Sequence, residues 1–220
     1  MGAVETGILK TSENLIMASD FKLRTFSFLD SYQPQLAQYI AKDNRVFDPS
    51  EYDAALFIEI APAMEIHAMV DLALKATRAR LGVIITERSF GQLEIHHENQ
   101  GEVMAAGQAI LDATGLTEND RVRCTLTTNK VIRGAEKDHC IAFTGMAPGN
   151  MVVPGDSVLI MECEPAGYMA YIANQALKAA NVKLNLVTTW GASGRLILAG
   201  SEAEIDAASA AATAAAGDIA

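Results

Sequence analysis

Two kinds of pattern in this chain could carry chemistry: metal-binding side chains and glycine-bearing loops. The run His96-His97-Glu98 offers metal ligands, but adjacent residues on a strand point to opposite faces, so the two imidazoles do not readily share one ion. His67 and His139 are isolated, and four histidines are too few to argue a Ser/His/Asp or Cys/His arrangement. We therefore expect no metal site, no cofactor and no catalytic residues.

The glycine-bearing loops lack the side chains that bind nucleotides. Gly145 to Gly149 and Gly191 to Gly194 contain neither the Lys-Ser/Thr of a P-loop nor the Gly-x-Gly-x-x-Gly of a dinucleotide fold. A turn-forming role is expected for both.

A third feature is the adjacent pair of opposite charges Glu87-Arg88. It follows the β-branched run 83–85 and precedes an alternating apolar and polar stretch, so it is expected in a loop between two strands, closed by Gly91. Such pairs are commonly solvated surface features. This one stands out because residues 188–194 occupy the same place in a second copy of the surrounding unit.

The duplication organises the whole chain. At an offset of 103 residues, 59–93 matches 162–196 without gaps, and roughly a third of the aligned positions are identical. A period of this size corresponds to a domain rather than to a solenoid repeat. We expect an N-terminal extension, residues 1–22, followed by two related domains, 23–116 and 117–220.

The apolar periodicity predicts the same elements in each domain. Strands are expected at 23–29 and 54–60, a turn and short helix between them at 30–40, and a helix after Pro62. The positions expected to be buried on this helix and its copy have helical spacing; they are Ile66, Met69, Val70, Ala73 and Leu74, and Met169, Ile172, Ala173, Ala176 and Leu177. The predicted class is α+β with a mostly antiparallel sheet, a ferredoxin-like variant.

A second helix in each domain begins with a predicted capping box. Asn99 with Glu102, and Ser201 with Glu204, have the spacing in which the first side chain accepts a backbone N–H and the Glu reaches back. The last helix, 204–216, is nearly all alanine and is expected to be thin and peripheral.

Composition excludes several partners. A formal charge of −10 and a pI near 4.8 provide no basic face for nucleic acid or an anionic membrane. We expect neither a signal peptide nor a membrane span, because no basic segment precedes an apolar core near residue 1 and no apolar run approaches about 20 residues. Cys124, Cys140 and Cys163 form no close pair, so buried free thiols in a reducing cytoplasm are expected.

Several motifs resemble those of one protein family, the tandem-domain, trimer-forming shell proteins of bacterial microcompartments (BMC). Residues 71–76 and their copy 174–181 are similar to the family's edge helix, and 190–194 looks like its pore loop. Further stretches resemble the circularly permuted subgroup found in carboxysomes and related compartments; they are 30–36, 59–62, 87–91 and 164–168. The resemblance extends from Leu23 to about Ala216.

The resemblance implies a structural role. Two permuted BMC domains per chain and three chains would form a pseudohexameric tile of a microcompartment shell in the cytoplasm, and two such trimers can stack. Partners would be further copies, other shell proteins and the metabolites that pass a central pore. Lys75 and Lys178 would lie at tile edges, and Glu87 and Arg88 would gate the pore. The pore lining would be Ser89, Phe90, Gly91, Trp190, Gly191, Ala192, Ser193 and Gly194.

Threefold symmetry would bring three copies of Glu87 and Arg88 to one axis, where the Glu87 of one chain can pair with the Arg88 of the next. Gly91 would supply the backbone freedom for opening. Residues 143–150 are apolar where the first copy, 40–47, is polar. The alternatives are a small-molecule sensor with duplicated ferredoxin-like domains, and an enzyme whose site the sequence does not reveal.

Overall fold

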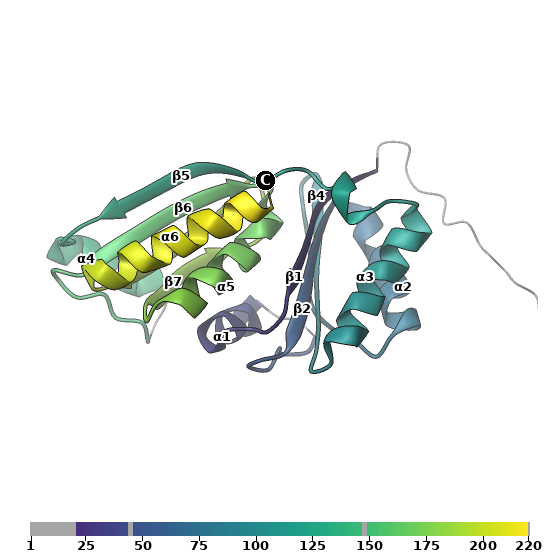
Figure 1. The fold of residues 1–220 in the computed structure, drawn as a ribbon, viewed down its shortest axis with the longest axis horizontal. Coiled ribbons are helices and arrows are strands. Elements are labelled where there is room, and N and C mark those ends of the chain that lie inside the picture. Colours follow the sequence, from purple (N-terminus) through teal and green to yellow (C-terminus); the bar gives the residue numbers. More distant parts are fainter. Residues whose placement is uncertain (1–20, 44–45, 147–148, 220) are drawn as a thin grey trace, which may run out of the picture.

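The computed structural model of the 220-residue chain describes residues 21–43, 46–146 and 149–219. All but two residues of the predicted N-terminal extension therefore lie outside the described part. Two four-stranded antiparallel sheets dominate the fold, with strand orders β1-β2-β4-β3 and β5-β6-β8-β7 (Figure 1). The predicted α+β class with antiparallel sheets is confirmed.

Apart from the 3-10 turn η2, the two halves contain the same elements in the same order. The first half comprises β1 (Lys22–Leu29), α1 (Pro34–Asp43), β2 (Ala54–Ala61), the 3-10 turn η1 (Ala63–Glu65), α2 (Ile66–Ala76), β3 (Arg80–Glu87), β4 (Phe90–His97) and α3 (Gln100–Thr114). The second half comprises η2 (Glu118–Asp120), β5 (Thr125–Ile132), α4 (Lys137–Met146), β6 (Ser157–Glu164), η3 (Ala166–Tyr168), α5 (Met169–Ala179), β7 (Lys183–Thr188), β8 (Gly194–Gly200) and α6 (Glu202–Asp218).

Most helices and strands of the two halves repeat at the same offset of 103 residues. Strands β1 and β5, and helices α1 and α4, begin and end 103 residues apart. The register of β1 shifts between Leu23 and Thr25, and that of β5 shifts between Leu126 and Thr128. Residues separated by this offset can therefore be compared as structural counterparts.

The first sheet is covered on both faces. One face packs under α2 and α3, whereas the other packs against α5 and α1 (Figure 1). On the second face, Leu29 and Phe57 share a core with Tyr168 and Met169 of the second half. The two halves are thus joined through a continuous apolar core, which favours one fixed arrangement.

The predicted helix faces are buried with one exception. In α2, Ile66, Met69, Val70 and Ala73 are buried, but Leu74 is 39% exposed, so its predicted burial is wrong. All five predicted positions of α5 are buried. The difference arises because α5 packs against both its own sheet and the first half, whereas α2 is covered by its own sheet and α3.

In each predicted capping box, the role of the first residue is confirmed and that of the glutamate is wrong. Asn99 Oδ1 accepts the Gly101 N–H at 2.8 Å and Ser201 Oγ accepts the Glu204 N–H at 3.4 Å. Glu102 and Glu204 bind elsewhere. Each accepts a backbone N–H that follows the preceding helix: Glu102 accepts from Arg78 after α2 at 2.9 Å, and Glu204 accepts from Asn181 after α5 at 2.7 Å. These carboxylates join α3 to α2 and α6 to α5.

Helix α6 is longer than predicted and lies beside α5 on the outside of the second sheet (Figure 1). Its buried face consists of Ile205 and small alanines, which allow close packing. The three cysteines are free and buried, as predicted. None of the helices in the described part of the chain is long and apolar enough to cross a membrane.

Gly91 and its counterpart Gly194 are required by close packing. A Cβ at Gly91 would overlap the Ala63 carbonyl oxygen and lie 2.8 Å from Ile66 Cβ. A Cβ at Gly194 would lie 2.6 Å from the Ala166 carbonyl oxygen. In each half, a strand passes directly beneath the 3-10 turn.

We therefore expect Gly91→Ala to destabilise the protein by about 1–3 kcal/mol, because the added methyl group must displace backbone. Gly145→Ala is the control, since a Cβ at that helical position meets nothing within 4 Å. The control should be neutral or stabilising by up to about 1 kcal/mol. Urea unfolding followed by circular dichroism measures both, and equal midpoints for the two variants would contradict the packing role.

Candidate functional site

The predicted gate residues lie at the tip of the β3–β4 hairpin. Arg88 and Ser89 form its turn, and Arg88 adopts a positive φ of 52°, which is uncommon for a residue other than glycine. The Arg88 side chain is 89% exposed, and its Nε lies 3.5 Å from Glu87 Oε1. The charge pair is thus presented outward on a short, exposed turn.

The base of this hairpin is held within the first half. The Arg24 guanidinium lies 3.6 Å from the centre of the Phe90 ring, a cation–π contact. Arg24 Nε also donates to Glu59 Oε1 at 2.5 Å. One arginine therefore connects the start of β4 to a buried carboxylate on β2.

The corresponding loop of the second half is longer and is tied to the first half. It spans residues 189–193, between β7 and β8. Gln92 Nε2 donates to the Thr189 carbonyl oxygen at 2.5 Å, and Thr189 Oγ1 donates back to Gln92 Oε1 at 3.0 Å. Both side chains are buried, so this amide anchors the loop in a fixed position.

The two loops line a common cavity of about 540 Å³. Its lining comprises Glu87, Arg88, Ser89, Phe90, Thr188, Trp190, Gly191, Ala192, Ser193 and Arg195. All predicted gate and pore residues belong to this lining except Gly91 and Gly194, which lie within β4 and β8. Sequence reasoning missed Thr188 and Arg195, although Arg195 directly follows the predicted loop.

A second anchor between the halves is the buried carboxylate of Glu59. The Gly167 N–H donates to Glu59 Oε2 at 2.8 Å, which links β2 to η3. Burial raises the pKa of Glu59, and hydrogen bonds and charge from Arg24 and the η3 backbone offset this only in part. An acceptor buried to this degree fixes the distance between the halves because its loss would leave backbone N–H groups unpaired.

Two further amides complete this junction. Gln35 of α1 donates from Nε2 to the Val182 carbonyl at 2.7 Å and accepts the Leu184 N–H at 2.9 Å. Asn174 of α5 is fully buried; it accepts the Gln33 N–H and donates to the Ser31 carbonyl, each at 2.9 Å. Uncharged amides therefore make most of the polar contacts between the halves.

The predicted edge lysines have different surroundings. Lys75 is 74% exposed at the end of α2 and binds Asp71 Oδ2 at 2.6 Å. Lys178 is 26% exposed at the end of α5 and binds the Asp30 carboxylate of the first half. Lys75 therefore faces outward, whereas Lys178 also joins the two halves.

The two neighbouring histidines also lie in different environments. His96 is buried and its Nδ1 lies 3.0 Å from Glu94 Oε1, which also accepts the Tyr32 hydroxyl. His97 Nδ1 instead accepts the Asn99 N–H. Among the described residues, no group of three or more His, Cys, Asp or Glu side chains is arranged to hold a metal ion.

Two permuted α+β repeats whose hairpin loops meet at one cavity define the tandem-domain class of microcompartment shell protein. Residues 23–120 match the model of the CsoS1D N-terminal domain. The carboxysome shell protein CsoS1D of Hydrogenovibrio crunogenus is 47% identical over 84% of this chain and 90% of its own. The carboxysome shell protein CcmP of Synechococcus elongatus is 41% identical over 88% of this chain and 91% of its own. The chain belongs to this CsoS1D/CcmP family of carboxysome shell proteins.

Solved structures agree with this assignment. The fused permuted hexameric shell protein MSM0275 of the RMM microcompartment has a TM-score of 0.87 and 36% identity, over 90% of this chain and 98% of its own. The double-ringed trimeric shell protein MSM0271 of the same microcompartment has a TM-score of 0.85 and 32% identity, over 90% and 97%. The predicted family and shell role are confirmed: the chain is a structural shell protein and not an enzyme.

Proposed function

We propose that three copies of this chain form a pseudohexameric tile of the carboxysome shell, and that the β3–β4 hairpin gates its central pore. In this proposal, residues 23–116 and 117–220 are the two BMC domains. Other shell proteins surround the tile, and metabolites cross the pore.

The main support is that each half carries two complementary surfaces, of which the chain itself joins one pair. Glu59 and Gln92 of the first half meet Gly167 and Thr189 of the second. The remaining pair, at the repeat offset, is accessible. Its members are Glu162 (34% side-chain exposure), Arg195 (60%), Met64 (67%) and Thr86, which is also exposed.

Repeating the internal junction between chains would bury this second pair. A head-to-tail contact of this kind forms a ring when the rotation closes. Six domains complete the ring when three chains take part. This agrees with MSM0271 being trimeric and with MSM0275 being a hexameric fused protein.

The same arrangement would place the hairpin tips around the axis. Three Glu87 and three Arg88 side chains would alternate there, and pairing between neighbours would neutralise all six and obstruct the opening. The exposed turn at Arg88 is the place for the backbone to change, since Gly91 is packed beneath Ala63. The second loop, held by Gln92, would remain fixed in both states.

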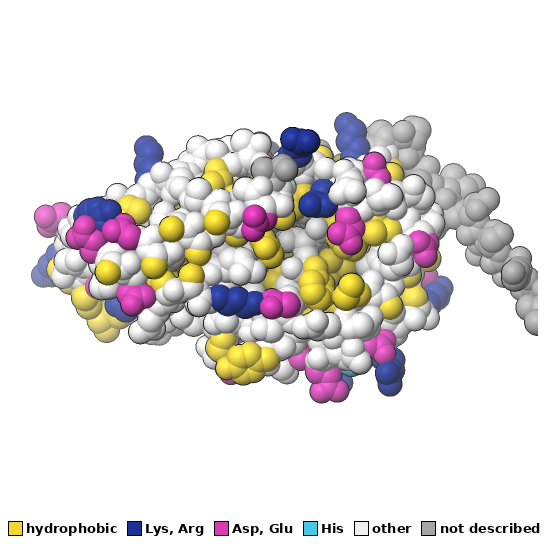
Figure 2. Space-filling model, in the orientation of Figure 1, with side chains coloured by type: hydrophobic (Ala, Val, Ile, Leu, Met, Phe, Trp, Pro, Cys, Tyr) yellow, Lys and Arg dark blue, Asp and Glu magenta, His cyan; other side chains and the backbone are white. Residues whose placement is uncertain are grey.

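A stacking surface for two trimers is proposed at α4 and the segment that follows it. Large apolar side chains are exposed there: Ile141, Met146, Met151 and Val153. Figure 2 shows hydrophobic side chains at this end of the molecule. At the same positions the first repeat has polar residues: Gln38, Asp43, Asp48 and Ser50. The relative MSM0271 is double-ringed, and a second trimer would cover the patch.

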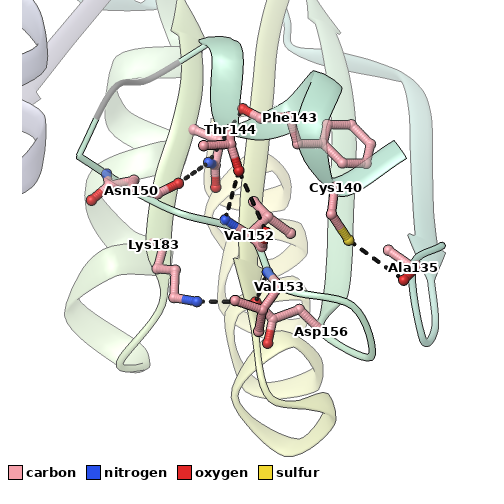
Figure 3. Close-up of polar contacts among 10 residues, drawn as sticks. Ala135, Cys140, Phe143, Thr144, Asn150, Val152, Val153, Asp156 and Lys183 are labelled. Carbon is pink, nitrogen blue, oxygen red and sulfur yellow. Dashed lines mark hydrogen bonds and ion pairs between the residues drawn. The ribbon is translucent and has the colours of Figure 1, made fainter. Parts of the chain in front are cut away.

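This surface is held in place by an internal polar network (Figure 3). Thr144 Oγ1 accepts the Val152 N–H at 2.9 Å, and Lys183 Nζ lies 3.0 Å from Asp156 Oδ2. The buried Asn185 donates to the Asn150 carbonyl at 2.8 Å. These bonds hold the backbone beside Met151 and Val153, as a specific contact requires.

The gate is tested by replacing Glu87 and Arg88 together with Ala. The trimer should persist, and cryo-EM maps should show a clear axial channel in every particle class, because no charge pair remains to close it. Asp112→Ala with Lys42→Ala removes one exposed charge of each sign outside the cavity lining and should leave the axis as in the wild type. An axis equally occluded in the gate variant and the wild type would refute the gate.

The edge is tested by Lys75→Asp. A long cation at a helix end can reach a neighbouring tile and donate to its backbone carbonyls, which a carboxylate cannot do. Electron microscopy should show sheets lost while solution mass shows the trimer intact. Lys178→Asp should in addition destabilise the chain, because two carboxylates would then meet at Asp30. If Lys75→Asp still forms sheets of unchanged extent, the proposed role of Lys75 at the tile edge is wrong.

A further inference from the structure

The internal junction and its counterpart surfaces differ in chemistry. Three amides, of which Gln92 and Asn174 are buried, make polar contacts between the two halves: Gln35, Gln92 and Asn174. At the repeat offset, each is replaced by an ionisable residue; these are Asp138, Arg195 and Asp71 respectively. At these three positions, the contacts inside the chain are made by neutral side chains, whereas the counterparts that would meet another copy are ionisable.

Arg195 is the replacement that lies in the cavity with the gate. Its Nε lies 3.1 Å from Glu162 Oε1, and its side chain is 60% exposed. Its counterpart Gln92 contacts Thr189, whose own counterpart in the first half is Thr86. Thr86 is exposed and directly precedes the gate residue Glu87.

We propose that Arg195 of one copy holds the gate hairpin of the next copy by donating to the main-chain carbonyl of Thr86 there. This rests on the proposed trimer. Gln92 both donates to a carbonyl and accepts a threonine hydroxyl. A guanidinium only donates, so Glu162, already bound to Arg195, provides the acceptor for the Thr86 hydroxyl.

The consequence is a difference in strength between the two loop anchors. The Gln92–Thr189 contact is buried and neutral, so salt and water compete with it little. The Arg195 contact lies in the cavity, where salt screens exposed charges and water competes for the same groups. The hairpin with Glu87 and Arg88 is therefore held by the weaker anchor and can change state while the other loop stays fixed.

The position of Arg195 next to Thr86 of the neighbouring copy is tested by cross-linking. In Arg195→Cys with Thr86→Cys, a short bismaleimide should join separate chains and give bands of two and three chains on a denaturing gel. The matched pair Asn129→Cys with Thr213→Cys replaces two exposed side chains that lie 3.0 Å apart within one chain, so it should react within that chain and leave the mass unchanged. The three native thiols are buried, so the unsubstituted protein provides the background.

The outcomes distinguish a failure of the proposed Arg195 contact from a failure of the proposed trimer. Intact trimers without linked chains, alongside normal reaction of the control pair, would overturn the Arg195 contact and leave the trimer standing. Failure of the unsubstituted protein to assemble would refute the proposed function itself.

The anchoring role is tested by hydrogen exchange in the hairpin of the assembled protein. Arg195→Ala should speed exchange of the amides in 86–90 about fivefold, as expected for loss of one hydrogen bond, with no change in 189–193. High salt should speed hydrogen exchange of the same amides in the wild type. It should not do so in Arg195→Gln, which places at this position the neutral amide that Gln92 carries. Hairpin exchange insensitive to both Arg195→Ala and salt would overturn the proposal.

Discussion

The structure depends on the contact between its two halves, in which buried polar side chains of the first half form hydrogen bonds with backbone groups of the second. Glu59 accepts the Gly167 N–H, and Gln92 forms two hydrogen bonds with Thr189. These bonds lie beside an apolar core that both halves share. Removing either side chain would leave buried polar groups unpaired, which costs about 1–3 kcal/mol for each group. The distance and rotation between the halves are therefore well determined.

The same contact supports the proposed ring and the proposed difference between the two loops. A duplicated domain joined head to tail leaves one complementary pair of surfaces at its ends, and the counterparts of the Glu59 and Gln92 contacts are accessible. The internal copy of the loop is locked by a neutral amide, whereas the hairpin that carries Glu87 and Arg88 ends in an exposed turn. In the proposed trimer, divergence of the two copies at these few positions would separate a fixed loop from a movable one.

Much of this could be predicted from sequence because the repeat is a local pattern. Helical spacing and the Glu87-Arg88 pair between two strands predicted the elements and the loops that meet at the cavity. Contacts between distant residues were not predictable. Nothing near Gln92 indicates that it binds a residue 97 positions away. Glu102 has the spacing of a capping box, but the neighbouring helix end presents a competing N–H. Leu74 follows the apolar period, yet no second layer covers it.

The central claim is that three chains close a ring by repeating the internal junction, and mass measurement in solution tests it most directly. The account predicts about 70 kDa, three times the 23.4 kDa chain, or twice that value when two trimers stack. A stable monomer at every protein concentration measured would contradict it.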